Sequence, residues 1–260
     1  MANSARRATD AGSAAVNLDP DDLARFAGTA ARWWDETGPA APLHKLNPAR
    51  LDFLRDVAIR HFDRDPRSLR PFAGLDAVDV GCGGGLVSEP LARMGFSVLG
   101  IDADARAITV AREHARLMGL ADRISYAVAT AEELAAEGRQ FALVCCLELV
   151  EHVPQPRRLI ADLARLTRPG GLIILSTLNR TARSFLEAIV AAEWLLGWVP
   201  RGTHDWNRFL TPAELTGWLR QEGCRIVAQT GISYDPCHDR FTLSDDIKVN
   251  YLLAATREEG

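Results

Sequence analysis

Cysteine, long apolar runs and excess positive charge are all scarce in this 260-residue sequence. The five cysteines include no C-x-x-C pair, which argues against both a disulfide framework and a zinc site and favours a reducing cytoplasm. No apolar run approaches the ~18 residues that a membrane-spanning helix needs, and the N-terminus has no hydrophobic signal core. The formal net charge of −4 gives no general attraction to nucleic acid, so we expect no nucleic-acid partner.

Short apolar runs of β type alternate with amphipathic runs of helix length from about residue 76 onward. This alternation predicts an α/β fold, with a parallel sheet covered by helices on both faces. We expect strands at 77–81, 97–102, 124–129, 141–148 and 172–178, with a tight turn at RPGG before the last of them. Near the C-terminus, CRIVAQTGISY and VNYLLAATR are expected to form two more strands, joined by a hairpin-like connection.

The remaining segments set the expected domain organisation. The first residues, 1–20, have the composition of a flexible tail. Residues 21–70 are helical in character and are expected to form a cap. The α/β domain is expected to occupy 71–260 and to carry a helical insert at about 180–215.

The stretch VDVGCGGG (78–85) predicts a ligand-binding turn after the first strand. Gly81 and Gly83 fit the start of a dinucleotide-binding G-x-G-x-x-G, but its third glycine is replaced by Leu86, and a P-loop lysine is absent. Asp102 ends the next strand, where a carboxylate accepts hydrogen bonds from ribose hydroxyls. These features favour S-adenosylmethionine, with its ammonium near Asp79. The alternative is a plain strand–helix turn followed by a surface aspartate.

A second cluster, Glu148, Glu151 and His152, follows the fourth predicted strand. The E-x-x-E-H spacing places the three side chains on one side if the segment turns helically. Two carboxylates and an imidazole can hold Mg²⁺ or a related cation, and manganese or zinc would also suit them. Alternatively, His152 acts as a direct general base. A third alternative gives these residues no catalytic role: Glu151 and His152 only begin the next helix, where a carboxylate is favoured.

Several of these pieces resemble the class I S-adenosylmethionine-dependent methyltransferases. The matching segments are VDVGCGGG, the strand ending in Asp102, FALVCCLELVEHV and RPGGLIIL. The resemblance implies a Rossmann-like, seven-stranded, mostly parallel sheet whose last strand is antiparallel. The resemblance identifies the cofactor but says little about the methyl acceptor.

Longer motifs resemble one group within that class, the ubiquinone biosynthesis O-methyltransferases. They are RWWDETGPAAPLHKLNPARL, CLELVEHVPQP, the segment 176–215, and GISYDP with VNYLL. The resemblance implies methylation of a phenolic hydroxyl on polyprenylated catechol and hydroxyquinol intermediates, at two steps. It also implies Arg50 against the methionine carboxylate, a metal role for the Glu-Glu-His cluster, and other enzymes of ubiquinone biosynthesis as partners. Leu147 would flank the adenosyl group, although it suits the core equally well.

The segment TARSFLEAIVAAEWLLGWVPRG mixes apolar and aromatic residues with arginines. Such a helix, at about 181–200, suits peripheral contact with the inner face of a membrane, where Arg180, Arg183 and Arg201 would attract anionic lipid. The same helix would suit packing on the sheet as a lid. Further candidates for the pocket are Trp33 and Trp34 as caps, Glu132 or Glu133 near the adenine, and His204 and Asp205 near the acceptor.

Three other functions compete with this interpretation. A methyltransferase of the same fold acting on a soluble catechol or another small acid predicts turnover that needs no prenyl tail. A non-catalytic membrane-binding module predicts binding without turnover. A nicotinamide-dependent dehydrogenase is disfavoured by Leu86.

Overall fold

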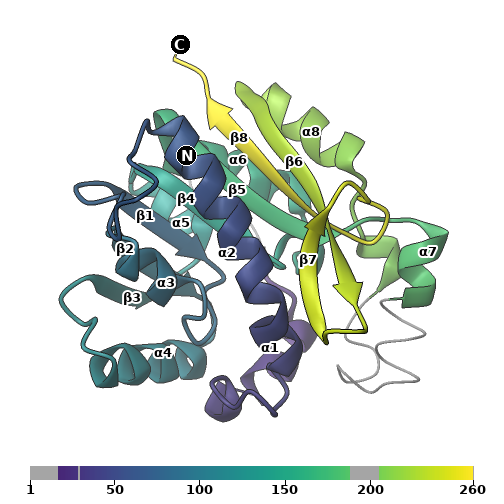
Figure 1. The fold of residues 1–260 in the computed structure, drawn as a ribbon, viewed down its shortest axis with the longest axis horizontal. Helices are drawn as coiled ribbons and strands as arrows, with labels where there is room; N and C mark the ends of the chain where they lie inside the picture. The colour runs from purple at the N-terminus through teal and green to yellow at the C-terminus, as the bar shows by residue number, and fades with distance from the viewer. Residues whose placement is uncertain (1–16, 29, 188–204, 260) are drawn as a thin grey trace, which may run out of the picture.

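The computed structural model describes residues 17–28, 30–187 and 205–259 as one α/β domain with an N-terminal cap (Figure 1). The cap comprises α1 (Pro20–Ala27), the 3-10 turn η1 (Ala30–Arg32) and α2 (Ala41–His61). The other described helices are α3 (Ser88–Arg93), α4 (Ala105–Leu117), α5 (Ala131–Ala136), η2 (Val150–His152), α6 (Pro156–Leu166), α7 (Ala182–Ser184), η4 (Trp206–Arg208) and α8 (Pro212–Gln221). No helix in these ranges combines the length and apolarity that crossing a membrane requires.

The sheet has eight strands in the order β3-β2-β1-β4-β5-β8-β6-β7. They are β1 (Asp76–Val80), β2 (Ser97–Asp102), β3 (Ile124–Val128), β4 (Phe141–Leu147), β5 (Thr167–Leu178), β6 (Cys224–Asp235), β7 (Arg240–Ser244) and β8 (Asn250–Arg257). The first five are parallel, and β8 runs antiparallel between β5 and β6.

The predicted α/β class and the antiparallel last strand are confirmed, but the predicted strand count of seven is too low by one. The extra strand is β7, which pairs antiparallel with β6 at the edge of the sheet. Its sequence, RFTLS, is only partly buried and therefore lacks the apolar signal of the central strands. The hairpin-like connection expected between the last two strands thus contains a strand of its own.

The RPGG segment also differs from the predicted tight turn, because β5 runs through it from Thr167. The pairing of β4 with β5 is irregular there: Phe141 lies opposite Thr167, whereas Leu143 already lies opposite Leu172. Gly170 takes a φ of 71°, which is costly for other residues. Residues 168–171 therefore interrupt the ladder with β4 inside the range of β5, rather than preceding the strand.

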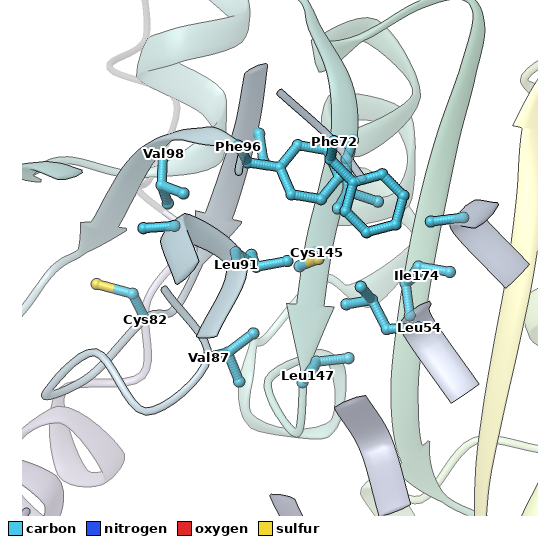
Figure 2. Packing of buried hydrophobic residues seen from close by; sticks show 14 of the residues in the cluster. Leu54, Phe72, Cys82, Val87, Leu91, Phe96, Val98, Cys145, Leu147 and Ile174 are labelled. Atoms are coloured by element: carbon cyan, nitrogen blue, oxygen red, sulfur yellow. The ribbon is translucent and has the colours of Figure 1, made fainter. Parts of the chain in front are cut away.

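Two apolar layers hold the helices against the sheet, one on each face. Helices α2, α3 and α4 contribute to one buried cluster, and α5, α6 and α8 contribute to the other. Figure 2 shows part of the first layer, where Phe72 and Phe96 stack with ring centroids 4.5 Å apart. Leu54 of α2 belongs to the same cluster as Cys145 and Ile174 of the sheet, and all three are labelled in that view. This packing fixes α2 across the sheet, with α1 near the end where β1 and β4 finish (Figure 1).

Candidate functional site: a cavity at the carboxyl ends of the strands

A cavity of about 290 Å³ lies where β1, β2 and β4 end, and the N-terminal cap forms one of its walls. Parallel sheets commonly bind ligands at this edge. All nine residues predicted for the site line the cavity: Arg50, Asp79, Gly81, Gly83, Asp102, Leu147, Glu148, Glu151 and His152. Two clusters that are far apart in sequence therefore share one space.

The glycine turn is shaped by positive backbone angles and by the protein's own side chains. Gly81, Gly83 and Gly85 have φ values of 73°, 51° and 93°, a region that glycine occupies without strain. A Cβ added to Gly83 would overlap the indole ring of Trp33, and one added to Gly81 would lie 2.8 Å from Leu149. The turn therefore needs glycine partly because these two side chains, which also line the cavity, lie close to its backbone.

Asp102 ends β2 and is held by the turn that it faces. Its carboxylate accepts hydrogen bonds from the amides of Gly83 at 2.9 Å and Asp104 at 2.8 Å. Burial raises the pKa of Asp102, against the effect of these hydrogen bonds. A carboxylate oxygen accepts more than one hydrogen bond, so both oxygens retain capacity for the two hydroxyls of a ribose.

Asp79 lies one residue before the end of β1 and is fully buried in the floor of the site. The Ser88 hydroxyl donates a hydrogen bond of 2.6 Å to its Oδ2. Burial raises the pKa of Asp79 to about 6, and the nearby Asp102 adds to the rise. A buried carboxyl group with a perturbed pKa in a cavity is a candidate for a functional residue.

Arg50 of α2 carries a buried guanidinium group close to Glu148. The side chain is 4% exposed, and its Nε and Nη2 have no hydrogen-bond partner among the described residues. Nη2 lies 3.1 Å from Glu148 Oε1, but without hydrogen-bond geometry. Because buried donors are rarely left unpaired, Arg50 is suited to an anionic ligand such as a carboxylate.

Glu148 follows β4 in a backbone conformation that is uncommon for glutamate. Its φ is 53°, and non-glycine residues in this region cluster at functional sites. Ser176 Oγ donates to Glu148 Oε1 at 2.6 Å, and Asn250 Nδ2 donates to the same oxygen at 3.2 Å. The helical turn expected over the whole E-x-x-E-H segment begins only at Val150.

Glu151 and His152 belong to η2 and bond in different directions. Glu151 is buried and accepts a 2.8 Å hydrogen bond from Thr177 Oγ1 on Oε2, while its Oε1 has no hydrogen-bond partner in the described part of the chain. Burial raises the pKa of Glu151, and the charge of Glu148 raises it further. His152 Nδ1 lies 3.4 Å from Asp22 Oδ2. Burial lowers the pKa of His152, but the hydrogen bond with Asp22 and the charge of Glu151 outweigh burial, so the net shift is upward.

The donor types around this second cluster suit a divalent cation. Two carboxylates and an imidazole line one cavity, and no described residue forms a hydrogen bond with the buried Oε1 of Glu151. Within the ranges that the structure covers, however, no three such side chains are grouped closely enough to hold a metal ion. Binding one would require these three side chains to move closer together.

The other sequence-predicted residues occupy varied places. Leu147 is nearly buried at the end of β4 and lines the cavity. Glu132 lines it too and pairs with Arg158, whereas Glu133 caps the start of α5 through Thr130. Trp34 stacks on the imidazole ring of His114, with centroids 3.5 Å apart.

Much of the predicted insert, 188–204 including His204 and Arg201, lies outside the described residues. Asp205 accepts a hydrogen bond from the Asn207 amide and so caps η4. Arg183 pairs with Glu187 and Asp246 at 2.5 Å each, and Arg180 pairs with Glu214. Two of the arginines expected to attract lipid are therefore already paired with carboxylates.

The sequence did not predict that N-terminal residues form part of the cavity wall. Asn17, Asp19 and Asp22 all line the cavity, although the first two fall within the predicted tail. Asn17 exchanges two hydrogen bonds with the backbone of Gln155, at 2.8 and 2.9 Å. Polar residues before a helix are expected as caps in any protein, so the sequence carried no distinct signal of this contact.

Comparison with known families defines the class of the protein. The family model described as "Methyltransferase domain" matches residues 52–229. The cavity, the glycine turn and Asp102 all lie within or against this segment. The chain therefore contains a methyltransferase domain.

Similar proteins of known family narrow this class. The chain is 45% identical to the mitochondrial ubiquinone biosynthesis O-methyltransferase of Arabidopsis thaliana, over 95% of this chain and 77% of that protein. It is 46% identical to the ubiquinone biosynthesis O-methyltransferase of Caulobacter vibrioides, over 96% of this chain and 100% of that protein. The chain belongs to the family of ubiquinone biosynthesis O-methyltransferases, which confirms the resemblance seen in its motifs.

Solved structures support the fold. Magnesium protoporphyrin IX methyltransferase from Synechocystis PCC 6803, solved with bound SAM, matches with a TM-score of 0.60 at 18% identity, over 94% of this chain and 100% of that one. An S-adenosylmethionine-dependent methyltransferase from Clostridium acetobutylicum matches with a TM-score of 0.63 at 12% identity, over 88% and 98% of the two chains. At such low identity these likenesses concern the fold alone.

Proposed function

We propose that the protein transfers the methyl group of S-adenosylmethionine to a phenolic hydroxyl of polyprenylated catechol and hydroxyquinol intermediates in ubiquinone biosynthesis, at both O-methylation steps. The observation that carries this proposal is the single cavity that joins Asp79, Asp102 and Arg50 to the Glu148–Glu151–His152 cluster. The near-full-length relatives named as ubiquinone biosynthesis O-methyltransferases support the choice of acceptor.

The cofactor half of the cavity matches the three polar parts of S-adenosylmethionine. Asp102 would accept the ribose hydroxyls, and Asp79 would face the ammonium group. The buried Nε and Nη2 of Arg50, which have no hydrogen-bond acceptor among the described residues, would bind the methionine carboxylate. Leu147 would contact the adenosyl group. When bound, the cofactor supplies an electrophilic methyl group on its sulfonium.

The acceptor half must make a phenol nucleophilic. A phenolic hydroxyl titrates near pH 10, about as tyrosine does, so it needs a base or a cation to become a phenolate at neutral pH. Glu148, Glu151 and His152 would hold Mg²⁺ or a related cation, which would stabilise the phenolate as a Lewis acid. In the alternative, His152 takes the proton itself. Alignment of oxygen, methyl carbon and sulfur then supplies much of the rate.

A polyprenylated acceptor resides in a lipid bilayer, so we infer peripheral membrane contact through the helix expected at 181–200. The exposed Phe185 and Leu186, 45% and 58% accessible at the start of this segment, support such contact. The arginine pairings make apolar insertion, rather than charge, its main driving force. Other enzymes of the pathway would pass their products to this site.

The test measures methyl transfer from labelled S-adenosylmethionine to two acceptors, a short-prenyl catechol and the demethylated quinol. Each assay is run with Mg²⁺ and with EDTA, and a matched catechol without the prenyl tail serves as control. Turnover of both prenylated acceptors, and little turnover of the control, is expected. Equal turnover without the tail would favour a soluble small-molecule acceptor, and cofactor binding without any turnover would favour a binding module. Turnover that survives EDTA would mean that His152 or another base, and not a bound metal ion, activates the phenolic hydroxyl.

A further inference from the structure

A carboxylate from the N-terminal cap contacts the imidazole of His152, although the two residues are far apart in sequence. Asp22 lies in the first turn of α1, and its Oδ2 lies 3.4 Å from Nδ1 of His152. The two side chains are only 13% and 11% exposed, and both line the cavity. This contact, between residues 130 positions apart, is at the long end of hydrogen-bond range, as catalytic contacts often are before substrate binds.

Asp22 is itself held from two sides. Arg208 of η4 places Nη1 3.2 Å from Asp22 Oδ2 and Nη2 2.6 Å from Asp19 Oδ2. The side chain of Asp19 also accepts the backbone amide of Asp22, at 3.3 Å. Arg208 comes from the far end of the insert, so it ties that region to the cap. The Asp22 carboxylate therefore approaches His152 from a fixed direction.

The contact determines which ring nitrogen of His152 is available to a ligand. A neutral imidazole carries one N–H donor and one lone pair. If Nδ1–H donates to the Asp22 carboxylate, the lone pair lies on Nε2. Histidines that bind metals or accept protons are commonly oriented by such a bond on the other nitrogen.

We propose that Asp22 is a positioning residue: its carboxylate accepts the Nδ1 proton of His152 and keeps Nε2 as the reactive nitrogen, while Arg208 holds Asp22 in place. The catalytic meaning of this contact rests on the proposed O-methylation. The role of the imidazole as base or as metal ligand does not alter the proposal, because both roles need the Nε2 lone pair.

The experiment compares Asp22→Asn with Asp21→Asn, a matched change at an exposed neighbour in the same helical turn. The ring nitrogens of His152 are observed by NMR in 15N-histidine-labelled protein, at a pH where the imidazole is neutral, with His152→Gln supplying the assignment. The expected wild-type signal is the Nδ1–H tautomer. Asp22→Asn should shift the population toward Nε2–H, and Asp21→Asn should leave it unchanged.

Kinetics and binding complete the test. In Asp22→Asn, kcat should fall about 10- to 100-fold, the range seen when the partner of a functional histidine is removed, while the Kd for S-adenosylmethionine stays the same. Arg208→Gln should reproduce a smaller part of the tautomer shift. An unchanged tautomer in Asp22→Asn would overturn the proposal, as would loss of cofactor affinity and melting temperature in step with kcat. If the wild-type protein shows no methyl transfer, the proposed function fails, but the tautomer measurement still decides the role of Asp22.

Discussion

Replacing Asp79 by asparagine should make the cofactor-free protein more stable and its cofactor binding weaker. Burial raises the pKa of this carboxyl from the usual value near 4 to about 6, which corresponds to roughly 3 kcal/mol of unfavourable free energy for the ionised form at neutral pH. Asparagine retains an acceptor for Ser88, but it brings a buried amide donor, and leaving that donor unpaired costs about 1–3 kcal/mol. The expected net gain is therefore about 1 kcal/mol, with about 3 kcal/mol as its upper limit.

The dependence of this gain on pH follows from the direction of the shift. Below pH 4 the carboxyl is protonated in both the folded and the unfolded state, so Asp79→Asn gains nothing by removing its charge. As pH rises from 4 through 6, the unfolded state ionises first and the wild-type protein loses relative stability. Above pH 6 the difference between wild type and variant is constant.

Urea unfolding of both proteins at several pH values measures this difference, with the exposed Asp52 changed to asparagine as control. Calorimetric titration should show S-adenosylmethionine binding about 10- to 100-fold more weakly to Asp79→Asn, because the ammonium loses an ionised partner. A variant that is less stable than wild type at pH 7, or that binds the cofactor equally well, would refute the reasoning.

Three further changes separate the parts of the site. Asp102→Ala should abolish cofactor binding in a calorimetric titration, because the ribose loses its acceptor; retained binding would remove Asp102 from the cofactor site. Glu151→Ala should bind the cofactor normally but lose turnover in the labelled-methyl assay, and unchanged turnover would end its assignment as metal ligand or base. Gly84→Ala should cost about 1–3 kcal/mol in urea unfolding, since its Cβ would overlap the Trp33 ring, whereas Gly217→Ala, with open space in α8, should gain about 0.5–1 kcal/mol. Equal effects of the two glycine changes would contradict the packing of Trp33.

The strand ends were predictable because the geometry of a parallel sheet is simple. Once β1, β2 and β4 are placed by their apolar runs, their carboxyl ends meet at one edge, and Asp79, Asp102 and Glu148 must come together there. The alternating pattern also placed the helices, since each must cover a face of the sheet. Fold class and the two clusters of the site therefore follow from the sequence.

Contacts between distant segments were not predictable in the same way. The packing of Trp33 on the glycine turn joins the cap to β1, and nothing in a tandem tryptophan distinguishes this from core packing. Asp22 has an ordinary explanation as an acidic residue in the first turn of a helix. The positive φ of Glu148 could not be predicted from the sequence either, because glycine is the main sequence signal of this backbone conformation.

The destination of the transferred methyl group tests the central claim most directly. The protein would be incubated with 13C-methyl-labelled S-adenosylmethionine and the short-prenyl catechol, and the product examined by carbon NMR. The account predicts a single labelled aryl methyl ether, formed by the wild-type protein and not by Glu151→Ala. Label on a ring carbon or on a carboxyl oxygen, or no label in any product while the cofactor remains bound, would contradict it.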